Sequence, residues 1–433
     1  MATATTPPSV STDSKPGALP TDAITYADLY GRWERGNWRA TELDFSEDAR
    51  QWREEFTEFE RQAALWNYCL FFWGEDAVAD NLSPFIDAAP LEEQKYFLTT
   101  QQVDEARHAV FFHRFMREVA GVGDRSISST LRATGGEITW GHRKVFGRLD
   151  QMADELRADR SKPQLARAVT LYHVIVEASL AQPGQHMIER YLEELDLLPG
   201  FREGMRNVSL DEQRHIGFGV KLLADLYRED PERIGDAIVG TLREVLPWTA
   251  AVAKPPGWDE TYMTAFGFTY DDLGEEGARS LEQKLRAIGL PIDSFPGFPM
   301  DMTLPPRERA RRGRAMLAGN FIGPDGPVAR DDETLGVVFD AIAQSADPRS
   351  VPAGTTVQWD FSDAEPWHVA LDDGATRAVR GAAPDPDVTL RMSLEDFGDV
   401  VAGRSDPRQL LLRRRVRVRG NPRLLLKLPR VFG

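Results

Sequence analysis

The feature that most constrains the fold of this chain is a glutamate–histidine pair that occurs twice with the same spacing. Glu105 and His108 form the first Glu-x-x-His unit, and Glu212 and His215 form the second. Each unit follows a helical segment that carries a lone glutamate within an apolar run. The sequence is therefore a pseudo-duplication, with Glu75, Glu105 and His108 in the first half and Glu177, Glu212 and His215 in the second.

Helical periodicity places these side chains on inward-facing surfaces. Leu98, Gln101, Glu105, His108 and Phe112 follow one another at spacings of three or four residues, so they form one stripe on a helix. The other segments show the same kind of stripe around their own glutamates and histidines. We therefore expect all of these side chains to meet in the core of a helical bundle.

Burial of four carboxylates in one core demands compensation. An uncompensated carboxylate costs several kcal/mol to bury, and two imidazoles cannot neutralise four negative charges. Two divalent cations can, and carboxylate and imidazole ligands suit iron or manganese. One glutamate from each of two helices, with Glu-x-x-His from each of two others, is the arrangement known for ferritin-like dimetal carboxylate proteins. The sequence thus predicts six metal ligands, namely Glu75, Glu105, His108, Glu177, Glu212 and His215.

Neighbouring residues predict how these ligands are supported. Asp104 and Asp211 precede the two motif glutamates, and each is placed to accept a hydrogen bond from a ligand imidazole and fix its tautomer. His173 lies one turn before Glu177 and is interpreted as a supporting or core histidine rather than as a ligand.

Simpler interpretations exist for each feature taken alone. A single Glu-x-x-His unit is common by chance, and Ser209 with Glu212 fits a helix capping box. Glu75 or Glu177 alone can pair with an arginine in a core. We prefer the dimetal interpretation because the duplication, with its matched upstream glutamates, explains all of these features together.

Helical patterns and breaker residues predict the organisation of the chain. The Pro183-Gly184 pair predicts a kink or bulge near the site. The expected helices cover residues 46–82, 90–120, 124–158, 162–196, 200–228, 231–245 and 275–289. The chain is therefore divided into a disordered tail (1–24), an all-α bundle (25–295), a linker rich in proline and glycine (296–330) and a second domain (331–433).

The second domain has a different pattern. A helix at 333–345 is followed by alternating segments that glycine and aspartate turns separate. Two short helices at 394–402 and 406–412, a strand at 414–419 and a last helix follow. The pattern predicts a small α+β domain, whose first strands are Thr355–Phe361, Trp367–Leu371, Thr376–Arg380 and Val388–Met392.

Composition limits the classes of partner and compartment. The net charge of −16 disfavours binding of nucleic acid, and of anionic membranes over most of the surface. The single cysteine, Cys69, fits a reducing, cytoplasmic setting, and no run of about 18 apolar residues predicts a membrane span. The exception is the basic segment 413–430, interpreted either as a solvated face or as a docking site for anionic lipid headgroups or an acidic carrier.

At the duplicated residues, the bundle resembles the small subunit of ribonucleotide reductase over about residues 45–290, and within it the ligand-binding oxidase branch. The resemblance implies that the six residues bind Fe/Fe or Mn/Fe, that the protein uses O2 and an electron donor, and that it forms a homodimer. The reductase usually has an aspartate at the Glu75 position, so the all-glutamate set resembles the oxidase branch.

Departures from the family pattern also favour an oxidase. Phe112 stands where the reductase has its radical tyrosine. The oxidase branch joins a tyrosine to a valine through an ether cross-link; Tyr172 matches that tyrosine, but Ala77 stands at the valine position. Arylamine N-oxygenases add a histidine at the position of Val208, so they rank lower.

Residues from about 333 to 433 resemble a sterol-carrier-protein-type lipid-binding domain. The similarity lies in the order of the strands, in the segment Pro384–Leu390 and in Arg417–Asn421. Such domains enclose an apolar tunnel for acyl chains or sterols, although this copy alternatively only packs against the bundle. The sequence does not assign the residues that would bind lipid.

The combined prediction is an O2-activating dimetal-carboxylate oxidase or oxygenase that acts on a hydrophobic, lipid or fatty-acyl-like substrate. Tyr68, Tyr172, Trp66 and Trp73 are candidate electron relays. The alternatives are a non-catalytic lipid-binding protein with a structural dimetal site, an N-oxygenase of the same superfamily, and an iron store. Iron storage ranks last because storage cages use shorter, single-domain bundles.

Overall fold

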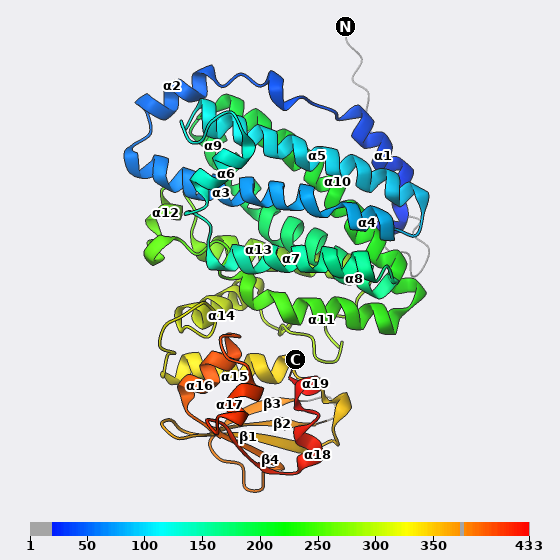
Figure 1. Cartoon of the computed structure of the whole chain (residues 1–433), viewed down its shortest axis with the longest axis vertical. Coiled ribbons are helices and arrows are strands. Elements are labelled where there is room, and N and C mark those ends of the chain that lie inside the picture. The colour runs from blue at the N-terminus through cyan, green and yellow to red at the C-terminus, as the bar shows by residue number, and fades with distance from the viewer. Residues whose placement is uncertain (1–19, 373–375, 433) are drawn as a thin grey trace.

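The structure is a computed structural model that describes residues 20–372 and 376–432. A helical bundle occupies one end of the molecule, and a smaller domain with a sheet occupies the other (Figure 1). The expected fold class, an all-α bundle followed by a small α+β domain, is confirmed. No helix within the described residues is long and apolar enough to cross a membrane.

The bundle is built mainly from long helices joined by short turns. Of the tail expected at 1–24, residues 1–19 lie outside the described residues, whereas Pro20–Ala23 forms a 3-10 turn, as do Ala40–Glu42 and Pro256–Trp258. The α-helices are α1 (Tyr26–Arg35), α2 (Ser46–Glu54), α3 (Glu58–Asn81), α4 (Ser83–Ala88), α5 (Glu92–Glu118), α6 (Ile127–Thr134), α7 (Trp140–Ala158), α8 (Lys162–Val169), α9 (Gln182–Glu194), α10 (Pro199–Glu229), α11 (Pro231–Thr249), α12 (Thr261–Thr264) and α13 (Tyr270–Ile288).

Caps fix where two of the site-bearing helices begin. Thr57 and Glu60 form a capping box at the start of α3. The start of α10 is capped from another helix, because the buried Asp48 of α2 accepts hydrogen bonds from the N–H groups of Gly200 (2.9 Å) and Phe201 (2.7 Å). A carboxylate stabilises a helix N-terminus, and the close approach requires glycine, since a Cβ on Gly200 would lie 2.2 Å from a main-chain oxygen.

The helix that carries Glu177 departs from α geometry. Thr170–Ala181, between α8 and α9, forms a π-helix of 12 residues. Pro183 occupies the first turn of α9, directly after it. The irregularity expected at Pro183-Gly184 therefore lies in the preceding turns. Such wide turns occur frequently at functional sites, and this one brings Glu177 into the core.

The C-terminal domain is a five-stranded sheet in the order β3-β2-β1-β4-β5. β1 and β4 are parallel, and the other neighbours are antiparallel. Phe339 of the first helix stacks on Trp367 and Phe397, with ring centroids 4.8 and 5.1 Å apart, and so anchors the core. The strands are β1 (Thr355–Phe361), β2 (Trp367–Leu371), β3 (Arg377–Arg380), β4 (Val388–Met392) and β5 (Arg417–Gly420); the helices are α15 (Asp332–Ser345), α16 (Leu394–Val401), α17 (Pro407–Leu412), α18 (Pro422–Leu425) and α19 (Leu428–Val431), with a 3-10 turn at Pro348–Ser350.

The segment 296–330, expected to be a linker, contains a helix. α14 (Pro306–Ala318) contacts both α13 and α15, and it lies between the bundle and the C-terminal domain in Figure 1. Prolines obscured it in the sequence, because Pro306 takes a first-turn position where a missing N–H costs nothing. The buried Arg309 donates to Glu282 of α13 at 2.5 Å and fixes α14 on the bundle.

Candidate metal centre

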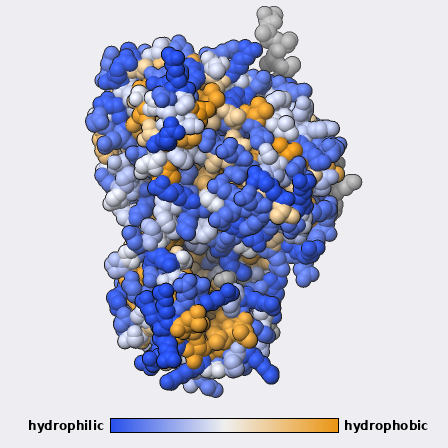
Figure 2. Space-filling model, in the orientation of Figure 1, coloured by the Kyte–Doolittle hydropathy of each residue, from blue (hydrophilic) through white to orange (hydrophobic). Residues whose placement is uncertain are grey.

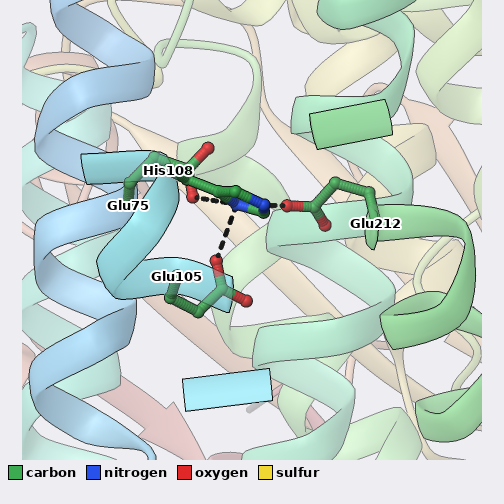
Figure 3. A group of neighbouring side chains, drawn as sticks. All are labelled: Glu75, Glu105, His108 and Glu212. Carbon is green, nitrogen blue, oxygen red and sulfur yellow. Dashed lines mark hydrogen bonds and ion pairs between the residues drawn. The ribbon is translucent and has the colours of Figure 1, made fainter. Parts of the chain in front are cut away.

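The structure brings all six predicted ligands together in the core of the bundle. They form two overlapping groups, and within each group the candidate ligand atoms lie within 4.8 Å of one another. Figure 3 shows the first group, in which three carboxylates surround the imidazole of His108. Because Glu105 and Glu212 belong to both groups, the arrangement suits two neighbouring cations that share ligands. The groups are Glu75, Glu105, His108 and Glu212, and Glu105, Glu177, Glu212 and His215.

Both histidines present Nδ1 to the carboxylates. His108 Nδ1 lies 3.2 Å from Glu75 Oε2 and 3.4 Å from Glu105 Oε2. His215 Nδ1 lies 3.1 Å from Glu105 Oε1 and 3.6 Å from Glu177 Oε1, yet it forms no hydrogen bond of suitable geometry within the described residues. The two imidazoles therefore offer the same nitrogen to the same cluster.

The outward nitrogens of the two histidines face aspartates of the opposite repeat. His108 Nε2 lies 3.1 Å from Asp211 Oδ2, and His215 Nε2 lies 3.1 Å from Asp104 Oδ2. A proton on Nε2 that is donated to the carboxylate leaves Nδ1 free to bind a metal ion. Each aspartate thus holds the histidine of the other Glu-x-x-His unit, a crossed pairing between α5 and α10.

The two aspartates belong to a buried layer of charges. Arg107 donates to Asp104, and Arg214 donates to both Asp104 and Asp211. Burial by itself would raise the pKa of Asp211, but the hydrogen bond from His108 and the neighbouring positive charges hold that pKa well below its usual value. Asp211 is therefore ionised and able to accept a hydrogen bond from His108.

Two tryptophans near the start of the chain complete this layer. Trp33 and Trp38 donate through Nε1 to Asp104 and Asp211, at 2.9 and 2.8 Å respectively. The tryptophans named from the sequence lie elsewhere: Trp66 packs against a tyrosine ring, with centroids 5.8 Å apart, and Trp73 donates to a threonine hydroxyl at 3.0 Å. Sequence reasoning missed Trp33 and Trp38 because they precede the periodic segments.

Tyr172 and His173 reach the cluster through a shared glutamine. The Tyr172 hydroxyl donates to Glu105 Oε1 at 2.5 Å, and Gln101 Nε2 donates to Tyr172 Oη at 2.9 Å and to Glu177 Oε1 at 2.8 Å. Burial lowers the pKa of His173 to about 3, so its neutral ring donates through Nε2 to Gln101 Oε1, 3.1 Å away. Gln101 lies on the predicted inward stripe, one turn before Glu105, but periodicity alone does not indicate its role as a link between Tyr172, His173 and Glu177.

The cluster is chemically suited to cations. Glu177 Oε2, Glu212 Oε2 and His215 Nδ1 are buried and lack a hydrogen-bond partner within the described chain. Burial raises the pKa of Glu75 to about 8, and burial together with the charge of Glu212 raises the pKa of Glu177 well above its usual value. Protein groups alone therefore leave these carboxylates poorly compensated, and the cluster is able to hold two metal ions.

Comparison with known protein families shows to which family this chain belongs. The profile of the family described as ribonucleotide reductase, small chain, matches residues 19–246, more than half of the sequence. This chain belongs to the ribonucleotide reductase small-chain family. The profile of the SCP-2 sterol transfer family matches residues 339–433. Both resemblances predicted from the sequence are thereby confirmed.

Solved structures similar to this member of the family include R2-like ligand-binding oxidases. The oxidase from Sulfolobus acidocaldarius is 26% identical with a TM-score of 0.52, and the match covers 66% of this chain and 94% of that chain. Two point variants of an R2-like ligand-binding oxidase, both with an anaerobically reconstituted Mn/Fe cofactor, are also 26% identical with a TM-score of 0.52, and those matches cover 61% of this chain and 93% of theirs. A substantial part of this chain thus extends beyond the shared fold.

One cavity joins the carboxylate cluster of this family member to its C-terminal domain. Its volume is about 1560 Å³, whereas ligand pockets usually measure roughly 300–1,000 Å³. Its bundle end is lined by the four glutamates of the cluster and by apolar residues of α3 and the π-helix; its middle is lined by residues of α13 and α14. In the C-terminal domain, the lining includes Trp359, Leu390, Met392, Phe397 and Phe432.

Proposed function

We propose that this chain is an O2-activating dimetal-carboxylate oxidase or oxygenase that acts on a hydrophobic, lipid or fatty-acyl-like substrate. The observation that carries this proposal is the cavity. The same space is lined by carboxylates able to hold metal ions and by the apolar interior of a domain related to sterol-transfer proteins. A substrate with a long apolar chain fits such a space and can place one of its carbon atoms beside the cluster.

The proposed centre contains either two iron ions or one manganese and one iron ion. When bound, these ions would supply the reduction of O2 and the oxidation of a C–H or N–H bond, with an external electron donor. Similar oxidases contain Mn/Fe, which supports this choice of metals. The residues that would hold the ions are Glu75, Glu105, His108, Glu177, Glu212 and His215, and Glu105 and Glu212 belong to both ligand groups.

The chain's own residues direct this chemistry. Asp104 and Asp211 hold the two imidazoles so that both Nδ1 atoms face the carboxylate cluster, where they would bind the metal ions. Burial and the charge of Glu105 raise the pKa of the Tyr172 phenol well above its usual value. Tyr172 therefore keeps its proton and holds Glu105 in place through a hydrogen bond. Beside the cluster, the cavity wall includes the apolar side chains of Phe71, Val78 and Val176, which would pack against an apolar substrate.

Two buried side chains favour the oxidase branch over its relatives. Phe112, at the position of the reductase's radical tyrosine, stacks on Phe71 with ring centroids 6.0 Å apart. Val208, at the position where N-oxygenases add a histidine, is fully buried and offers no ligand atom. A homodimer remains a further expectation from the family.

The test is to mix anaerobically reduced, metal-loaded protein with O2, with and without a long-chain fatty acid. An oxidase gives a transient optical absorption and an oxidised fatty acid, and Glu105→Ala abolishes both. Glu118→Ala, at the exposed end of the same helix, is the matched control and retains them. Full O2-dependent turnover by the metal-free protein or by Glu105→Ala would refute the proposal.

A non-catalytic lipid-binding protein with a structural dimetal site would share the same cavity, but it predicts a different outcome. The fatty acid would bind, while the reduced protein would leave it unchanged after exposure to O2. The same mixing experiment, followed by mass spectrometry of the recovered fatty acid, separates the two functions.

A further inference from the structure

The C-terminal segment of this acidic protein is strongly basic. Residues 407–433 contain nine arginines and lysines and no acidic residue, although the whole chain has a net charge of −16. All nine side chains are exposed, and within the described residues only Arg415 lies at ion-pair distance from a carboxylate, that of Asp396 at 2.5 Å. We call this set the basic C-terminal surface: Arg408, Arg413, Arg414, Arg415, Arg417, Arg419, Arg423, Lys427 and Arg430.

Exposed leucines stand among these cations. Leu412 and Leu426 are 84% and 82% exposed, and Leu411 is 39% exposed. Figure 2 shows a hydrophobic patch over the C-terminal domain, in the region where Figure 1 draws α17. Exposed leucines forgo the free energy of burial, so a group of them on one surface indicates that something else covers it.

Two of these exposed leucines line the cavity that also contains the carboxylate cluster. Leu411 and Leu426 line it together with Leu425, Leu428 and Phe432, while the carboxylates of the cluster line its far end. The same cavity is therefore lined by exposed leucines at one part and by the carboxylate cluster at another. Arg408 of the basic C-terminal surface also lines it.

This combination fits an anionic lipid surface better than other acidic partners. Guanidinium and ammonium groups attract anionic headgroups, while exposed leucines insert among acyl chains. Single-stranded nucleic acid would call for exposed aromatic side chains that stack on bases, and the described part of the segment has none beyond the half-buried Phe432. An acidic protein would leave unexplained why exposed leucines of this surface line an apolar cavity.

We propose that the basic C-terminal surface docks on an anionic membrane, with Leu411, Leu412 and Leu426 inserted, and that a single-chain lipid passes from the membrane into the cavity toward the metal centre. Docking and uptake do not require oxidation of the lipid. Only the oxidation of the lipid after uptake rests on the proposed function. The acidic remainder of the chain orients the molecule, because it is repelled from the same membrane.

Docking is tested by co-sedimentation of the full-length, metal-loaded protein with vesicles. Vesicles of equal parts phosphatidylcholine and phosphatidylglycerol should bind it, vesicles of phosphatidylcholine alone should bind it at least about tenfold more weakly, and salt should weaken binding. The double variant Leu412→Asp/Leu426→Asp should lose binding. Leu195→Asp is the control, because Leu195 is 58% exposed but lies on the bundle. Equal binding to both vesicles, or unchanged binding of the double variant, would overturn the proposal.

Passage through the cavity is tested at α14. Gly313 lines the cavity between the two parts, and the nearest atom to a Cβ placed there is Ala250 Cβ at 3.8 Å, so Gly313→Trp has room to fill the passage. Ala318→Trp, at an exposed position outside the cavity lining on the same helix, is the matched control.

The probe is a fatty acid with a diazirine near its methyl end, taken up from anionic vesicles without O2 and then irradiated. Wild type and Ala318→Trp should give cross-links around Val176 in the bundle, whereas Gly313→Trp should bind vesicles normally and give cross-links in the C-terminal domain alone. If wild type gave no cross-links in the bundle, or if Gly313→Trp gave as many as wild type, the proposal that the lipid passes through the cavity would be wrong. Because O2 is absent, failure of the oxidase proposal leaves this result unchanged.

Discussion

In the bundle, Arg107 and Arg214 are almost fully buried against Asp104 and Asp211, so the charges of this layer have their partners inside the protein. In the C-terminal domain, the nine cations of the basic C-terminal surface face solvent, and within the described residues Arg415 alone pairs with a carboxylate. Both sets are rich in arginine, yet the arginines of the bundle layer are buried and paired, whereas those of the basic C-terminal surface are exposed and, Arg415 excepted, have no carboxylate partner within the described residues. Buried arginines that pair with carboxylates thus indicate a structural role. Exposed arginines without such a partner indicate a surface that contacts another body.

The largest expected effect follows from removing a shared ligand of the bundle. Glu212→Ala takes a carboxylate from both groups, so we expect the protein to lose both metal ions, whereas Glu75→Ala affects one group and should leave one ion bound. Metal content per chain after loading and gel filtration, measured by inductively coupled plasma mass spectrometry, distinguishes the two. Equal metal content in the two variants would contradict the shared role of Glu212.

Removing a buried cation should destabilise the bundle strongly. Arg214→Met leaves Asp104 and Asp211 undercompensated, and we expect the free energy of unfolding to fall by about 3–5 kcal/mol. Denaturant unfolding followed by circular dichroism measures the loss. Arg214→Lys keeps a positive charge and should recover part of the lost free energy of unfolding. If Arg214→Met left the free energy of unfolding unchanged, the buried arginines would not have the structural role that distinguishes them from the exposed ones.

A smaller effect is expected from the crossed aspartates. Asp104→Asn weakens the hydrogen bond that orients His215, so metal affinity should fall about 10–100-fold, and the ion of the second group should be the one affected. Competition with a coloured chelator measures the affinity. Asp154→Asn, at an exposed site on α7, should leave it unchanged. Loss confined to the group that contains His108 would show that the pairing is not crossed.

The smallest effect on stability should come from the basic C-terminal surface. Arg419→Met removes an exposed cation, so we expect the free energy of unfolding to change by no more than about 0.5 kcal/mol. Binding to anionic vesicles should nevertheless weaken about fivefold, since one cation near the membrane contributes about 1 kcal/mol. A large loss of stability in Arg419→Met would make these arginines structural.

The sequence was sufficient to place the six candidate ligands in one core, because helical periodicity shows which residues of a helix share a face. Periodicity does not show how two helices are set against each other. The pairing of Asp104 with His215, and of Asp211 with His108, therefore appears only in the structure. Trp33 and Trp38 were missed for a related reason, since they reach the site from outside the periodic segments.

In some segments the sequence pattern fits more than one local structure, and there the structure differs from the expectation. The prolines of 296–330 suggested a linker, but a proline at the start of a helix is favourable, and α14 follows Pro305 directly. The strands expected at 376–380 and 414–419 are found as Arg377–Arg380 and Arg417–Gly420, because strand ends depend on the neighbouring strand. The cavity depends on side chains from both domains, so no single segment could reveal it.

The crossed pairing has a consequence for the two halves of the bundle's repeat. Each half supplies two glutamates and a histidine to the cluster, but the aspartate that orients its histidine comes from the other half. A chain with one half alone would complete such a centre only by meeting a second copy of itself around a twofold rotation axis. The site is thus organised about an internal pseudo-twofold axis, and neither half is a working unit by itself.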